Sequence, residues 1–233
     1  MATIKEIVYD IKNLIRGGMQ SDDEIISDRQ IEFQINNLRA QFIRQDINKR
    51  RSISDNVKQI IHALEVEQVP KSIVGLGDSH DYIMRSKHKI PNPIETSHSD
   101  LITAIGPSGI LSVNFHMIPY NRAPWAGTNK YTKQMQCAFL LDSFVYVVGP
   151  NTNLLKTIKV EGVWQDPREI SNFSYQNNSI LSYDPETEDY PISTSMLTLI
   201  KQQMLALNLK PLVETPTDIS NNAKSDMQPN IQK

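Results

Sequence analysis

Residues 136–148, QCAFLLDSFVYVV, are the stretch of this chain that decides its fold. Two apolar runs, 136–141 and 144–148, stand on either side of Asp142-Ser143, a pair of residues that suits a tight turn. The pattern predicts two antiparallel strands joined by a hairpin. Because neither run alternates with polar residues, we expect both faces to be covered, by helices on one side and by a neighbouring subunit on the other.

The segments around this hairpin also carry β signals. Residues 111–117 alternate between apolar and polar side chains, which predicts a half-buried strand. Residues 157–160 alternate in the same way before Gly162, where we expect a bulge. Residues 72–99 are irregular and predict a loop with one or two short edge strands.

Helical patterns lie towards both ends of the chain. Thr3 and Glu6 have the spacing of a capping box, and the helix that they start is expected to end at Gly17-Gly18. The strongest helical pattern covers residues 28–46, with Ser27 as its cap. Its apolar positions recur at steps of four, three and four, at Ile31, Ile35, Leu38 and Phe42. We expect its other face to meet water or another subunit; that face carries Glu32, Gln34, Asn36, Arg39 and Gln41.

Two more helices are predicted. A short one covers residues 54–67 and is stopped by Pro70. Another begins at the cap Ser193 and ends near Lys210, because Pro211 follows. Residues after 211 are polar and are expected to be disordered in the isolated protein.

These patterns predict an α+β fold, with a helical bundle of N- and C-terminal helices and a central antiparallel β module. The expected parts are an N-terminal helical part (1–68), a central β module with long loops (69–188), a C-terminal helix that packs on the N-terminal helices (189–211) and a flexible tail that orders on a partner (212–233).

Composition narrows the classes of function. A net charge of −2 removes any global electrostatic argument for a nucleic-acid or membrane-surface binder. The single cysteine, Cys137, lies in an apolar run and excludes an intramolecular disulfide. No run reaches the roughly 18 apolar residues of a membrane span, so we expect a soluble protein made in the cytoplasm.

The local motifs give little indication of catalysis, nucleotide binding or metal binding. Asp78-Ser79-His80-Asp81 contains the residue types of a hydrolase triad but lacks the glycines of a nucleophile elbow, and a polar turn is the better interpretation. Gly75-Leu76-Gly77 lacks the lysine and hydroxyl of a phosphate loop. The histidines do not have metal-ligand spacing, and His116 is expected to be exposed or at an interface. No catalytic, metal or cofactor residue is predicted.

Two other features allow two interpretations each. The basic residues Arg44, Lys49, Arg50 and Arg51 either make weak phosphate contacts in a DNA channel or simply favour a helix C-terminus. Trp164 either packs beneath its own turn or anchors a partner, and Asp166-Pro167 beside it favours a turn.

Four phrases of the sequence carry a resemblance to a known family. They are MATIKEIVYDIKNLIRGGMQSDD (1–23), SDRQIEFQINNLRAQFIRQDI (27–47), VEGVWQDPRE (160–169) and DYPISTSMLTLIKQQMLAL (189–207). In this order they resemble head-to-tail connector proteins of short-tailed bacteriophages, of the adaptor or tail-tubular type, and especially ring proteins of crAss-like phages. The segment 72–124 is longer than the connection expected in the smaller adaptors.

The resemblance implies a virion structural protein without catalytic residues. It implies a homo-oligomeric ring, a dodecamer as is usual for the family, that surrounds the DNA. Such a ring contacts the portal protein and other connector or tail rings in the neck of the virion. No membrane and no cofactor is implied. A ring closes through two different surfaces of each subunit, and a helical part beside a β module offers two.

Assembly is expected to use the exposed sides of the helix 28–46, the hairpin 136–148 and the C-terminal tail. The residues expected at subunit interfaces or in structural motifs are Phe33, Arg39, Phe42, Trp125, Phe144, Tyr146, Trp164, Asp166 and Pro167. Two rival functions stay open. One is a small hydrolase that uses His80 or His116 with a carboxylate. The other is a DNA-binding regulator that uses the Arg44 to Arg51 cluster, for which residues 54–67 are a poor match to a recognition helix.

Overall fold

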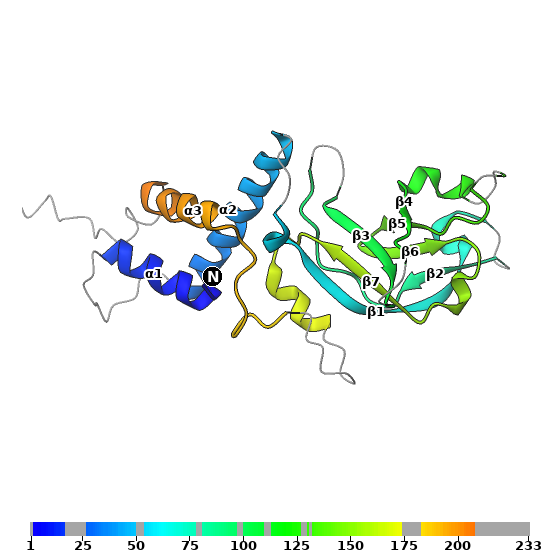
Figure 1. Ribbon diagram of the computed structural model, residues 1–233, viewed down its shortest axis with the longest axis horizontal. Helices are drawn as coiled ribbons and strands as arrows, with labels where there is room; N and C mark the ends of the chain where they lie inside the picture. Colours follow the sequence, from blue (N-terminus) through cyan, green and yellow to red (C-terminus); the bar gives the residue numbers. More distant parts are fainter. Residues whose placement is uncertain are drawn as a thin grey trace, which may run out of the picture.

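The computed structural model of the chain describes residues 2–16, 27–49, 54–77, 81–96, 100–109, 113–126, 130, 132–173 and 183–207. Three α-helices lie together at one end of the molecule, and a curved sheet lies at the other (Figure 1). The predicted α+β class is confirmed. The bounds of the helices are α1, Ile4–Arg16; α2, Asp28–Asn48; and α3, Thr194–Leu207.

The helices begin where the sequence predicts them. The backbone N–H of Glu6 donates to Thr3 Oγ1 at 3.4 Å, and the side chains of Ser27 and Gln30 form a complete capping box on α2. At α3, the N–H of Met196 donates to Ser193 Oγ at 3.3 Å. The predicted end of α1 at Gly17-Gly18 and the tail after residue 211 lie outside the described residues.

The helices share one core although α1 and α3 are far apart in the sequence. The buried side chains of this core are mainly isoleucines and methionines. Burying one such side chain completely stabilises the fold by about 1.5–3 kcal/mol. The N–H of Tyr190 also donates to the Ala2 carbonyl at 3.1 Å, which ties the start of α1 to the segment before α3. The buried residues of this core include Ile7, Ile11, Ile31, Ile35, Ile43, Ile200 and Met204.

The sheet has seven strands in the order β3-β7-β1-β2-β6-β5-β4. All neighbours are antiparallel apart from β4 and β5, which are parallel. The bounds are β1, Gln59–Pro70; β2, Tyr82–Ser86; β3, Ile102–Pro107; β4, His116–Met117; β5, Cys137–Leu141; β6, Phe144–Val148; and β7, Thr157–Gly162.

The sheet curls until its two edges meet. The first half of β1 pairs with β7 and the second half pairs with β2, so this one strand passes from one side of the fold to the other. At the edges, the N–H of Phe115, just before β4, donates to the carbonyl of Ile105 in β3 at 2.7 Å. The curled sheet encloses a second core, which includes Ile61, Leu64, Ile105, Val145, Val147, Ile158, Val160 and Trp164.

The hairpin of residues 136–148 is confirmed as β5 and β6. Asp142 and Ser143 both have positive φ, 52° and 65°, as a two-residue hairpin turn requires. Both faces are covered within the subunit. Short helices cover one side, as expected, and the sheet core covers the side where we expected a neighbouring subunit. Val145 and Val147 point into the sheet core, whereas Phe139 and Tyr146 lie in a third cluster with Val74 and Ala123 of two short 3-10 helices, Lys71–Val74 and Tyr120–Trp125.

The helix predicted for residues 54–67 is wrong, because this segment holds one 3-10 turn (Asp55–Val57) and the start of β1. A register irregularity between Ile61 and Leu64 explains the error. The extra residue places both side chains in the core three positions apart, and this spacing imitates the period of a helix.

Two other predictions for the β region need correction. The strand expected over 111–117 is reduced to His116–Met117, and residues 110–112 lie outside the described residues. The edge strands expected in 72–99 are wrong, because β2 lies in the interior of the sheet between β1 and β6.

Gly149 provides a test of the packing at the end of β6. Its φ is 144°, and a Cβ there would lie 2.8 Å from the carbonyl oxygen of Met135 and 2.9 Å from Gln136 Cα. Since both are backbone atoms, Gly149→Ala should lower the free energy of unfolding by about 1–3 kcal/mol, measured by urea denaturation. The control Gly109→Ala, where no atom lies within 4 Å of the new Cβ, should change it by less than about 0.5 kcal/mol. Equal effects of the two substitutions would contradict this description.

Candidate functional site

A group of buried polar side chains lies where the helices meet the sheet. Arg39, in the middle of α2, is fully buried. Its Nε donates to the Pro191 carbonyl at 2.7 Å, its Nη1 to the Trp164 carbonyl at 2.7 Å, and its Nη2 to the Val57 carbonyl at 3.4 Å. We call this arrangement the Arg39 junction. It connects α2 to the start of β1, the end of β7 and the segment before α3.

Backbone oxygens satisfy the guanidinium of Arg39. Burial lowers its pKa, while Tyr190, Tyr183 and Asp166 act in the opposite direction. An arginine stays protonated in proteins, so the junction holds a buried positive charge solvated by carbonyl dipoles. The ring of Tyr190 lies 5.7 Å from Arg39 Cζ and adds a cation–π contact.

A buried pair next to the junction joins α2 to the segment before α3. The hydroxyl of Tyr190 donates to Asn36 Oδ1 at 2.5 Å, and both residues are buried. Burial raises the pKa of Tyr190 well above its usual value, so the hydroxyl remains a donor.

An ion-pair network joins α2 to the turn after β7 on the outer side of the junction. Arg168 binds the carboxylate of Asp166 at 2.9 Å through Nη2, and its Nη1 contacts Glu32 of α2. Burial alone would raise the pKa of Asp166, but the hydrogen bonds and charge of Arg168 outweigh it and hold this pKa below its usual value. Asp166 also accepts the backbone N–H of Arg168 at 3.0 Å, which closes the turn that contains Pro167.

The face of α2 that carries Asn36 and Arg39 is thus not free to meet water or another subunit, and that prediction is wrong for these two residues. The reason is that α2 is covered twice, by α1 and α3 on one side and by the junction on the other. The informative signal was the position of Arg39 itself. It stands four residues after Ile35 and four before Ile43, in line with a buried row.

The three aromatic residues of the sheet proposed for interfaces occupy different environments. Trp164 is fully buried in the sheet core, and its backbone bridges to Pro93. Tyr146 is buried and stacks on Phe139 with ring centroids 5.2 Å apart. Phe144 is partly buried, with Arg85 Cζ 4.8 Å from its ring centroid.

The remaining interface candidates lie nearer the surface. Phe42 packs partly buried against the helical core. Phe33 on α2 is 61% exposed, and Trp125 at the end of its 3-10 helix is 72% exposed. An interface role for them remains a prediction.

The proposed DNA-contact residues are only partly described. The Nε of Arg44 donates to the backbone carbonyl of Glu95 at 2.9 Å, so this exposed side chain holds the β module against α2. Lys49 is exposed at the end of α2, and Arg50 and Arg51 lie outside the described residues.

The structure describes only some of the residues that the two rival functions would use. Ser79 and His80 lie outside the described residues, and His116 is exposed on β4. Within the part of the chain that the structure describes, no group of three His, Cys, Asp or Glu side chains could hold a metal ion. The recognition helix that a DNA-binding regulator would need in 54–67 is replaced by β1. In the same described part, no helix is long and apolar enough to cross a membrane.

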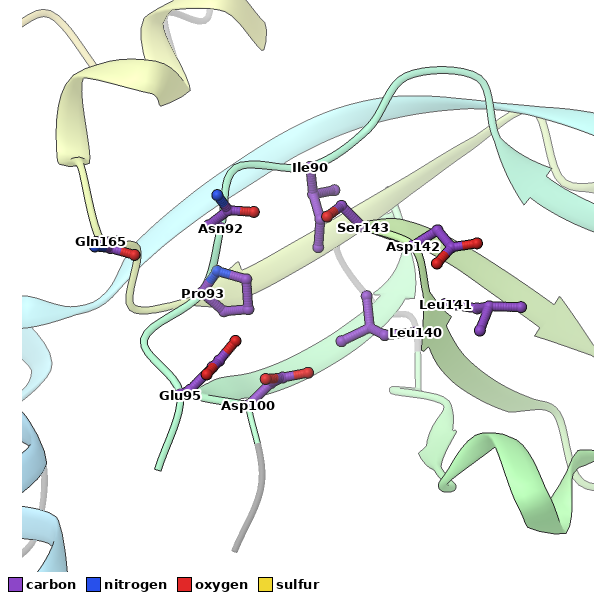
Figure 2. Close-up of a pocket in the computed structure, with 10 residues that line it drawn as sticks. All are labelled: Ile90, Asn92, Pro93, Glu95, Asp100, Leu140, Leu141, Asp142, Ser143 and Gln165. Atoms are coloured by element: carbon purple, nitrogen blue, oxygen red, sulfur yellow. The ribbon is translucent and has the colours of Figure 1, made fainter. Parts of the chain in front are cut away.

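A polar pocket of about 330 Å³ opens beside the junction, between the β5–β6 turn and the segment that carries Asn92 (Figure 2). Two hydrogen bonds frame it, from the N–H of Ile90 to the Ser143 carbonyl and from the N–H of Gln165 to the Asn92 carbonyl, both 2.9 Å. The acidic residues that line it are Glu95, Asp100 and Asp142.

The buried charge, the tyrosine pair and the ion-pair network all hold one part of the chain against another, which is a structural role within the subunit. A family model described as phage tail ring protein 2 matches residues 6–227, and the chain belongs to this family of crAss-like phage ring proteins. No curated protein matches the chain. The resemblance to crAss-like ring proteins is confirmed, and the family places the chain in the virion as a structural protein.

Arg39→Met should be strongly destabilising. It leaves the carbonyls of Val57, Trp164 and Pro191 without their donor, and we expect the free energy of unfolding to fall by about 2–4 kcal/mol in chemical denaturation. The matched control is Arg44→Met, on the same helix but exposed and with a single carbonyl contact, which should cost less than about 1 kcal/mol. A loss at Arg39 no larger than at Arg44 would show that the junction does not stabilise the fold.

Proposed function

We propose that this chain forms a homo-oligomeric ring, a dodecamer, in the head-to-tail connector of the virion. In this proposal the ring bridges portal and tail and surrounds the channel through which DNA passes. The observation that carries the proposal is the match of the ring-protein family to residues 6–227, almost the whole chain.

The shape of the subunit supports a closed ring. The subunit is elongated, with the helices at one end and the sheet at the other (Figure 1), so each copy has well-separated surfaces that can meet different neighbours. Contacts of this kind generate a ring when the rotation closes. The Arg39 junction supports the same conclusion, because a ring subunit must keep its two surfaces at a fixed angle.

The charge of the chain suits a conduit that does not grip DNA. A net charge of −2 provides no general attraction for phosphates, and tight binding would oppose passage. In the predicted DNA-contact cluster, the side chain of Arg44 donates a hydrogen bond to the backbone carbonyl of Glu95. Lys49, in the same cluster, is exposed at the end of α2. We therefore expect DNA to pass without sequence-specific contacts.

Cryo-electron microscopy of intact virions tests this proposal. We expect twelve copies of the chain around the central axis between portal and tail, with DNA density on that axis. A ring with another number of copies would contradict the dodecamer but would leave the connector function in place. Copies located away from the axis, or in the capsid shell, would contradict the connector function.

A further inference from the structure

The segment from β4 to the start of β5 carries exposed apolar side chains and exposed cations. We call the exposed side chains of Met117, Tyr120, Arg122, Trp125, Lys130 and Lys133 the distal surface. Trp125 is 72% exposed, Met117 41% and Tyr120 39%. Within the described residues, no carboxylate forms an ion pair with Arg122, Lys130 or Lys133.

The segment that carries the distal surface has no acidic residue of its own. Residues 101–141 contain no Asp and no Glu, while Arg122, Lys130 and Lys133 all lie within them. Tryptophan and arginine are also the side chains most enriched at the centres of protein interfaces. DNA phosphates would use the cations but would gain nothing from Met117, Tyr120 and Trp125, so the combination favours a protein partner with an acidic surface.

The polar pocket beside the junction has the complementary charge. Glu95 and Asp100 face each other across an isolated β-bridge, and their carboxylates lie close together on one side of the pocket (Figure 2). Burial and the neighbouring charge of Glu95 raise the pKa of Asp100. Among the described residues, no cation forms an ion pair with Glu95, Asp100 or Asp142. An arriving ammonium or guanidinium group would therefore relieve the repulsion between Glu95 and Asp100.

The two surfaces are separated within one subunit. Lys133 precedes the start of β5, whereas Asp142 lies in the turn at the other end of that strand. Two complementary patches on different parts of one chain are what a head-to-tail contact between copies needs.

We propose that the distal surface of each copy docks on the acidic pocket of the next copy in the ring. The positive charges of Arg122, Lys130 and Lys133 pair with the carboxylates of Glu95, Asp100 and Asp142. The side chain of Trp125 adds apolar area that the contact buries. This inference rests on the proposed homo-oligomeric ring.

Reciprocal charge reversal of the full chain tests the inference. One variant is Arg122→Glu with Lys133→Glu, and the other is Glu95→Arg with Asp100→Arg. Each variant alone presents like charges on both surfaces, so its self-association should weaken at least tenfold by sedimentation velocity. An equimolar mixture should assemble again, since the variants can alternate around an even-numbered ring.

The control is Lys156→Glu with Lys159→Glu, which changes the net charge by the same amount as the distal variant at another site and should assemble like the wild type. Circular dichroism and urea unfolding establish that each variant is folded. Association that is unchanged in both reversed variants would overturn the docking inference and leave the ring in place. A distal variant that loses DNA binding but still associates like the wild type would overturn it as well. A wild-type chain that stays monomeric at every concentration would instead contradict the homo-oligomeric ring itself.

Discussion

The rest of the structure depends on the burial of one guanidinium. Arg39 is removed from water, and a charge in that position is stable only when its donors are satisfied. The partners are carbonyls of Val57, Trp164 and Pro191, which come from three separate segments. Helix α2 can therefore adopt its position only when the start of β1, the end of β7 and the approach to α3 are all in place. Apolar packing alone would tolerate many orientations of the helices, whereas these directed hydrogen bonds specify one.

The curled sheet makes a second contribution to a fixed shape. The irregularity in β1 between Ile61 and Leu64 lets one strand pair with β7 at one end and with β2 at the other. The hydrogen bond from Phe115 to Ile105 then joins the two edges of the sheet. A sheet with joined edges offers few free backbone groups for uncontrolled strand addition. In the ring that we propose, contacts between copies would therefore use exposed side chains such as Trp125.

The features that the sequence predicts correctly are local ones. Ser27 caps α2 through residues three positions away, and the pair Asp142-Ser143 forms a turn whose geometry depends on two residues. Features set by distant segments were missed. The bulge in β1 gives buried residues a helical spacing. The position of Arg39 indicates burial, but the carbonyls of Trp164 and Pro191 that make this burial possible come from distant segments. The pocket has no local signal at all, because its walls come from four separate segments. The ring family was predicted from the order of four phrases, which is a property of the whole chain.

The central claim is that the Arg39 junction makes the helices and the sheet one cooperative unit, as a ring subunit requires. Native-state hydrogen exchange of the full chain at increasing denaturant measures this directly. We expect the amides of Ile35 in α2 and Val160 in β7, both buried in their cores, to exchange through the same opening, with the same free energy and the same denaturant dependence. Exchange of Ile35 through an opening that leaves Val160 protected would contradict the claim, because the helices would then unfold without the sheet.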